Sequence, residues 1–137
     1  MNTYVLDTSV TIAWYLEESF SISARKWQER LLAGKIALIV PTLHYWEFAN
    51  AMRTLIQRRE ITRALASETY ELHLQAPLEI VDPNPDSVLE TALDYGATAY
   101  DAVYINLCLS RDVPLITAEK TTTLWVTKLR NRIEPVR

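Results

Sequence analysis

Short apolar segments alternate with longer helical patterns along this chain, and that alternation limits its fold more than any other feature of the sequence. Residues 35–40 (KIALIV) and 113–117 (VPLIT) are continuous apolar runs, a pattern typical of strands that are buried on both faces of a parallel sheet. The expected strands are 4–6, 35–40, 78–81, 113–117 and 133–136, the last at an edge because it contains Pro135. The sequence therefore predicts an α/β fold in which helices cover both faces of a parallel sheet.

Helical periodicity and capping residues define the segments between these strands. Thr42, Thr62 and Thr98 can each cap a helix, and Gly34 and Gly96 are typical helix stops. The expected helices are 9–17, 21–32, 42–59, 62–75, 84–95, 98–110 and 119–130. In the helix over 62–75 the expected apolar side consists of Leu65, Tyr70, Leu72 and Leu74. No linker, repeat or low-complexity tract interrupts this pattern, so we predict one domain over residues 1–137.

The composition excludes several classes of protein. The net charge is −3, from 17 acidic against 14 basic residues, which argues against binding nucleic acid through a broad basic surface. An enzyme whose acids surround metal ions is compatible with that balance. Because the chain has only 2 glycines, it contains no Gly-rich phosphate loop, and a nucleotide-binding domain of that kind is excluded.

The sequence also lacks the features of membrane and secreted proteins. No apolar run approaches the roughly 20 residues that span a bilayer, and the first residues do not form a secretion signal. One cysteine, Cys108, excludes an internal disulfide, and we expect a cytoplasmic protein without membrane association. His44 and His73 form no metal-binding pair by spacing, and each is expected at the surface or at an interface.

Four acidic residues occupy matching places relative to the expected strands and helices. Asp7 and Glu119 each follow a strand, and ligands of open α/β sheets bind beyond the carboxyl ends of strands. Glu47 and Asp101 each fall in the first two turns of a helix, and no charge follows Asp101 until after residue 109. If these helices begin at the same edge of the sheet, the four carboxylates converge there.

Each of these acids also has an ordinary structural explanation. Asp7 can be a turn or capping residue, and Asp101 has capping-box spacing with Thr98. Glu47 can be a solvated residue on a helix flank, and Glu119 a first-turn acid favoured by the helix dipole. The functional interpretation depends on their common arrangement, because carboxylates brought together repel one another unless their pKa values rise or cations bind. Hard oxygen ligands select Mg²⁺ or Mn²⁺, ions that can activate water and position a phosphodiester.

Four segments carry a resemblance to a known family: 4–10 (YVLDTSV), 44–52 (HYWEFANAM), 97–108 (ATAYDAVYINLC) and 114–119 (PLITAE). In order and spacing they resemble the PIN-domain nucleases, and within them the VapC-like toxins of type II toxin–antitoxin systems. The resemblance implies a PIN-like fold, a three-layer α/β/α arrangement with a central, mostly parallel five-strand sheet. It also implies a Mg²⁺- or Mn²⁺-dependent endoribonuclease that cleaves RNA and is inhibited by a cognate antitoxin. Homodimers are implied as well, with the aromatic helix 42–59 as a candidate interface.

The resemblance also assigns residues to the site. It implies that Asp7, Glu47 and Asp101 bind the metal and that Glu119 assists them in catalysis. The supporting side chains would be Thr8, Ser9, Asn50 and Thr117. Members of the family commonly have Asp where this chain has Glu119, whose carboxylate reaches about 1.5 Å further at most. Because Mg²⁺ requires close octahedral geometry, Glu119 could bind through water or support a second metal only.

Two other functions are compatible with the sequence. One is a catalytically weakened PIN-fold module that binds proteins, which the departure at Glu119 favours. Trp14, Trp46 and Trp125 would be contact residues of such a module, unless they pack in the core. The other is the same metal chemistry acting on structured DNA.

Basic residues near the predicted site could hold the substrate. Lys120 adjoins the site, and Arg53 belongs to a cluster with Arg58, Arg59 and Arg63 around the turn between two helices. These side chains could contact phosphates of RNA, or they could form an ordinary solvated face. The same acidic pocket could attract an Arg or Lys of an antitoxin in place of the metal.

Overall fold

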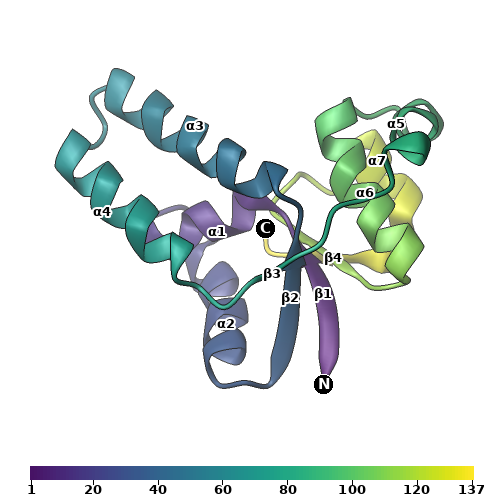
Figure 1. The fold of residues 1–137 in the computed structure, drawn as a ribbon, viewed down its shortest axis with the longest axis horizontal. Coiled ribbons are helices and arrows are strands. Elements are labelled where there is room, and N and C mark those ends of the chain that lie inside the picture. Colours follow the sequence, from purple (N-terminus) through teal and green to yellow (C-terminus); the bar gives the residue numbers. More distant parts are fainter.

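The computed structural model describes residues 1–137 and has five strands in one sheet (Figure 1). The strands are β1 (Asn2–Leu6), β2 (Ile36–Val40), β3 (Glu79–Ile80), β4 (Leu115–Thr117) and β5 (Ile133–Pro135). Their order is β3-β2-β1-β4-β5, and every neighbouring pair is parallel. The predicted parallel sheet is confirmed, and the strand that contains Pro135 lies at an edge as expected.

The central strand β1 fixes the geometry of the carboxyl edge of the sheet. Val5 pairs with Ile39 of β2 on one side and with Leu115 of β4 on the other. Directly after β1, the backbone N–H of Asp7 donates to the Ile116 carbonyl at 3.0 Å. Asp7 therefore leaves the sheet at the middle of its carboxyl edge, between β2 and β4.

Helices cover the sheet on both faces. They are α1 (Thr8–Tyr15), α2 (Ser21–Leu32), α3 (Leu43–Gln57), α4 (Arg63–Leu74), α5 (Val88–Tyr95), α6 (Ala99–Arg111) and α7 (Leu124–Leu129), with short 3₁₀ turns at Pro85–Ser87 and Arg130–Arg132. In Figure 1, α1 to α4 lie on one side of the sheet and α5 to α7 on the other. None of these helices is both long enough and apolar enough to cross a membrane.

Each face of the sheet has its own hydrophobic core. Tyr4 and Leu6 of β1 belong to one core together with Trp14 of α1. Val5, between them, belongs to the other core together with Ile105 of α6. Because successive side chains of a strand point to opposite faces, this split confirms the three-layer α/β/α arrangement.

Helices α3 and α4 form a hairpin that projects from this body (Figure 1). A small third core of Phe48 and Met52 from α3 and Ala66 from α4 holds the two helices together. The buried side of α4 consists of Ala66, Thr69 and His73, whereas Leu65, Leu72 and Leu74 are exposed. The apolar side predicted for this helix is therefore wrong for its three leucines, whereas Tyr70 is partly buried against the third core as expected.

Two of the three predicted threonine caps are confirmed. Thr62 and Thr98 each accept a hydrogen bond at 3.1 Å from the backbone N–H three residues later, at the starts of α4 and α6. Thr42 also stands at the N-cap of α3, but its hydroxyl donates to Asp82 Oδ2 at 2.8 Å instead of capping the helix. That bond ties the start of α3 to the segment that follows β3.

The helix predicted over residues 119–130 is wrong in its first half. Helix α7 spans only Leu124–Leu129, and Glu119 lies in a bend after β4. The backbone N–H of Glu119 donates to Thr117 Oγ1 at 3.0 Å, which turns the chain immediately after the strand. Three threonines then occupy positions 121–123. Their hydroxyls compete for backbone groups and favour turns over helix.

Candidate metal centre at the carboxyl edge

Asp7 lies at the N-cap of α1 with extended backbone angles, φ −77° and ψ 144°. Two hydroxyls donate to its Oδ2 atom, Thr117 at 2.8 Å and Ser9 at 3.0 Å. Ser9 Oγ in turn accepts the backbone N–H of Ala118 at 3.2 Å, so that the ends of β1 and β4 are locked together. These bonds orient the carboxylate of Asp7 and leave its Oδ1 atom without a protein donor.

Glu47 lies in the second turn of α3 and is held at one oxygen. The Tyr104 hydroxyl of α6 donates to Glu47 Oε1 at 2.6 Å. The Thr8 hydroxyl lies 3.1 Å from the same oxygen. The carboxylate of Glu47 therefore connects α3 with α1 and α6 at the carboxyl edge.

The carboxylates of Asp7, Glu47 and Asp101 lie near enough for their charges to interact. The pKa of Asp7 rises from 3.8 to about 6, mainly through burial and with the help of the charges of Glu47 and Asp101, although hydrogen bonds from Thr117 and Ser9 oppose the rise. Burial also raises the pKa of Glu47, and the charge of Asp101 adds to that increase. The pKa of Asp101 is raised as well, mainly by burial. The structure thus brings three of the four acids that were predicted to converge near one another.

The three carboxylates do not close around a single point. No group of three or more His, Cys, Asp or Glu side chains has the arrangement that would enclose a metal ion. Mg²⁺ keeps several of its waters and is usually held by one or two carboxylates, so that it does not require such a cage. An acidic edge with raised pKa values and a free Oδ1 at Asp7 fits a hydrated divalent cation.

Glu119 lies beside the site but apart from the electrostatic group of the other three acids. Its backbone is bonded to Thr117 and its side chain is partly buried. The groups that raise the pKa of Asp7 include Glu47 and Asp101 but not Glu119.

The other predicted site residues differ in their placement. Thr8 and Thr117 are buried and hydrogen-bonded to site carboxylates. Asn50 is exposed on α3, one turn after the site glutamate, and Lys120 is exposed in the loop after β4. Arg53 is also exposed, and it donates to Gln57 of its own helix at 3.2 Å.

Three buried residues near the site were missed by the sequence interpretation. Tyr104 was not assigned a role, although its spacing of three residues from Asp101 places it on a neighbouring face of α6. His44 and His73 were expected at the surface or at an interface, which is wrong, because both are inside this chain with 0% exposed area. Their Nε2 atoms lie 2.9 Å apart, and the His73 ring stacks on Phe48 with 4.3 Å between the ring centroids.

The tryptophans also divide between core and surface. Trp14 and Trp125 are buried, whereas Trp46 of α3 has 62% of its surface exposed. Of the three proposed contact residues, only Trp46 is free to meet a partner.

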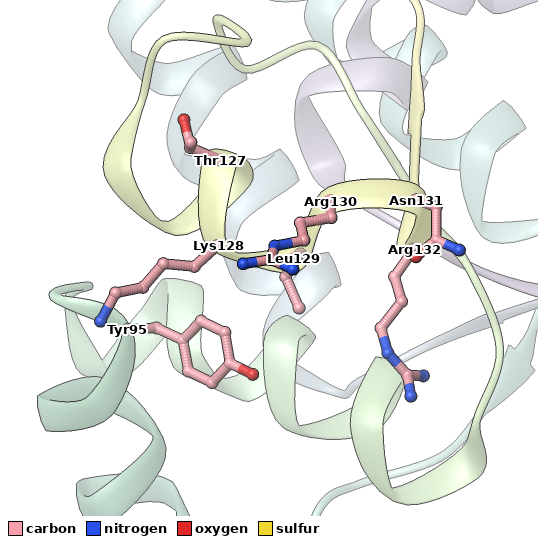
Figure 2. A pocket seen from close by; sticks show the side chains of 7 residues that line it. All are labelled: Tyr95, Thr127, Lys128, Leu129, Arg130, Asn131 and Arg132. Carbon is pink, nitrogen blue, oxygen red and sulfur yellow. The ribbon is translucent and has the colours of Figure 1, made fainter.

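A cavity of about 430 Å³ between α5 and α7 contains none of the candidate site residues (Figure 2). Lys128 lies above the Tyr95 ring, 5.9 Å from its centroid, and donates to the Asp94 carbonyl. Arg132 forms an ion pair with Asp112 at 2.8 Å. Lys128 and Arg132 already have partners, and the cavity contains no acidic side chain, so the carboxylate site is the stronger candidate for binding a cation.

Fold and site together define an α/β protein with a carboxylate-rich site at the carboxyl edge of a parallel sheet. This chain belongs to the PIN domain family, whose model matches residues 4–121. The resemblance found in the four sequence motifs is thereby confirmed.

Solved structures with the same fold cover nearly the whole chain. PAE2754 from Pyrobaculum aerophilum has a TM-score of 0.75 and 22% identity, covering 96% of this chain and 83% of its own. VapBC2 from Rickettsia felis, solved with a DNA fragment of its promoter, has a TM-score of 0.66 and 14% identity, covering 97% and 98%. VapBC-1 from nontypeable Haemophilus influenzae has a TM-score of 0.62 and 18% identity, covering 98% of each chain. At these identities the likeness shows a shared fold. A comparison with curated protein sequences found no match.

Proposed function

We propose that this protein is a metal-dependent endoribonuclease and the toxin of a toxin–antitoxin pair. The observation that carries this proposal is the electrostatic coupling of three carboxylates, from β1, α3 and α6, at one edge of the sheet. A Mg²⁺ or Mn²⁺ ion bound there would lower the pKa of a water molecule and stabilise the leaving oxygen of a phosphodiester. The proposed single domain over residues 1–137 would supply these ligands.

The residues of the site have separate roles in this proposal. Asp7, Glu47 and Asp101 hold the cation through their carboxylate oxygens. Thr117 and Ser9 orient Asp7 by donating to Oδ2, so that Oδ1 is presented to the ligand. Glu119 assists from the end of β4, through water or at a second cation.

Exposed residues around the site are the proposed contacts for RNA and proteins. Lys120 and Arg53 would hold phosphates of the RNA, since both side chains are exposed. A toxin–antitoxin complex from Klebsiella pneumoniae has the same fold, with a TM-score of 0.61 and 14% identity, which supports a cognate antitoxin as partner. The exposed leucines 65, 72 and 74 of α4 would bind it, and α3, with Trp46, would form the homodimer interface.

A protein-binding module with weakened catalysis is the second candidate. The position of Glu119 outside the coupled group of acids favours it, as does the exposed Trp46. This module would bind its partner tightly and cleave no RNA in the presence of Mn²⁺.

The decisive experiment compares RNA cleavage by the wild-type protein and by Asp101→Asn. We expect the wild type to cleave a pool of structured RNAs with Mg²⁺ or Mn²⁺ and to lose this activity in EDTA. Asp101→Asn should reduce cleavage by at least about a hundredfold, because the charge of a half-buried ligand is lost without a change of shape. Asp94→Asn, which changes an exposed acid of α5, is the matched control and should cleave normally.

Circular dichroism would verify that each variant is folded. EDTA-resistant cleavage by the folded Asp101→Asn protein would disprove the proposal. Cleavage of structured DNA in preference to RNA would keep the metal chemistry and change the substrate.

A further inference from the structure

A continuous chain of five polar contacts runs through the interior from Tyr15 to Glu47. The contacts are Tyr15 Oη to His73 Nδ1 at 2.8 Å, His73 Nε2 to His44 Nε2 at 2.9 Å, His44 Nδ1 to Thr8 Oγ1 at 3.0 Å, Thr8 Oγ1 to Tyr104 Oη at 2.7 Å, and Tyr104 Oη to Glu47 Oε1 at 2.6 Å. It joins α1, α3, α4 and α6. The four central residues are buried, and no buried side-chain polar atom of the structure lacks a partner.

The two histidines are neutral at pH 7. Burial, together with the neighbouring His73, lowers the pKa of His44 to about 3. Burial lowers the pKa of His73 to about 4. A neutral imidazole has one N–H donor and one acceptor nitrogen, so that only one of the two facing Nε2 atoms carries a proton.

The carboxylate end of the chain fixes the direction of its first three bonds. An ionised Glu47 can only accept hydrogen bonds, so the single hydroxyl proton of Tyr104 lies in this 2.6 Å contact. Tyr104 must then accept from Thr8 across 2.7 Å. Thr8 has no second proton and must accept from His44, which is therefore protonated at Nδ1.

The remaining two bonds follow from the tautomer of His44. Its Nε2 atom is an acceptor, so His73 donates to it from Nε2. The Nδ1 atom of His73 then accepts from the Tyr15 hydroxyl. Five protons occupy five contacts, and all point from Tyr15 toward the carboxylate. The opposite tautomer of His44 would take the Thr8 proton and leave two oxygens facing each other at 2.7 Å without a hydrogen.

We propose that the two histidines are positioning residues that hold the hydroxyl protons of Thr8 and Tyr104 in the direction of Glu47. Tyr104 donates to Oε1, and Thr8 supports Tyr104 by donating to it, which orients the carboxylate and leaves Oε2 for a ligand. This inference rests on the proposed function of Glu47 as a cation ligand. The direction of the hydrogen bonds from Tyr15 to Glu47 can be measured without that function.

The role of His73 is to select the tautomer of His44. Without a donor at His73, His44 could carry its proton on Nε2, where Thr11 Oγ1 lies 3.5 Å away and can accept. The Nδ1 atom would then compete with Tyr104 for the Thr8 proton. A change at His73, which does not touch the site, would thus weaken the bond by which Thr8 supports Tyr104, the donor to Glu47.

The first test reads the tautomers directly in the full-length protein labelled with ¹⁵N-histidine, at pH 7 in EDTA. Long-range ¹H–¹⁵N correlation spectra should show His44 protonated at Nδ1 and His73 protonated at Nε2. Protonation of His44 at Nε2, or a doubly protonated ring, would overturn the proposal.

The second test uses His73→Phe with His73→Gln as matched control. Phe keeps the aromatic packing on Phe48 but removes the donor, so that the His44 proton should move toward Nε2. The dissociation constant for Mn²⁺, measured by calorimetry, should rise about three- to tenfold, the effect of one hydrogen bond on a ligand. Gln can donate from its amide and should retain both the tautomer of His44 and most of the affinity.

An unchanged tautomer together with unchanged Mn²⁺ affinity in His73→Phe would overturn the proposal. Should that variant not fold, the wild-type spectrum decides alone. These tests also separate a failure of this inference from a failure of the proposed function. If the wild-type protein has the stated tautomers but neither binds Mn²⁺ nor cleaves RNA, the direction of the hydrogen-bond chain is confirmed and the nuclease function is disproved.

Discussion

The Asp7 carboxylate is held in a position that disfavours its charge. Burial raises its pKa from 3.8 to about 6, although Thr117 and Ser9 donate to it. Between about pH 4 and pH 6 the folded protein therefore holds this proton while the unfolded chain releases it. Stability falls as the pH rises through this range, and the full penalty is present above pH 6.

Asp7→Asn should remove this penalty. We expect the variant in EDTA to be more stable than the wild type by about 1–3 kcal/mol at pH 7.5, because a difference of two pKa units corresponds to roughly that free energy. At pH 4 the two proteins should be nearly equal. Urea unfolding at both pH values measures the difference, with Asp94→Asn as the control that should show no such pH dependence. A variant that is less stable at both pH values would contradict the pKa argument.

Single residues also show what a sequence can and cannot reveal. Asp7 and Asp101 could be placed at the site because a strand end and a helix start fix their positions within a few residues. His44 and His73 are 29 residues apart, and their contact exists only because α3 and α4 cross with these two faces together. No local pattern encodes that crossing.

At the scale of elements, the start of α6 carries an acid of the site. Thr98 accepts the backbone N–H of Asp101, so that the same bond caps the helix and fixes the backbone of a proposed ligand.

Thr98→Ala should destabilise the protein by about 1 kcal/mol, because a helix N–H loses its acceptor. Thr98→Ser keeps the hydroxyl and should lose much less. Urea unfolding of both variants with the wild type measures the two costs. Equal costs for Ala and Ser would mean that the methyl group of Thr98, and not its hydroxyl, stabilises this end of α6.

Helices and strands could be predicted from the sequence where a single hydrophobic or capping pattern was clear. The strands follow from continuous apolar runs, and α6 from a cap followed by an uncharged helix. Helix α4 was assigned correctly, but its buried side was not, because Ala66, Thr69 and His73 pack inward and its leucines do not. The start of α7 was missed because the turn depends on a side chain of β4, Thr117.

At the scale of the whole molecule, the site connects all three layers. Asp7 follows the central strand, Glu47 belongs to a helix of one layer, and Asp101 to a helix of the other. A cation bound between these carboxylates would link the two helical layers to the sheet and relieve the repulsion of their charges.

Mn²⁺ should therefore stabilise the folded protein. At a concentration a hundredfold above its dissociation constant, the ion should add about 2.7 kcal/mol to the free energy of unfolding. Thermal unfolding followed by circular dichroism, with and without Mn²⁺, measures the gain. In Asp101→Asn the gain should be much smaller. The same gain in that variant would place the ion elsewhere on the protein.

The pairing of β1 on both of its sides has a consequence for how the molecule comes apart. A strand with neighbours left and right is released only when the sheet itself separates, whereas projecting helices such as the α3–α4 hairpin can fray alone. Heat or denaturant would then loosen the far end of the hairpin first. Glu47 lies in the second turn of α3 and is bonded to Tyr104 of α6, so it would stay beside Asp7 until the body itself unfolds.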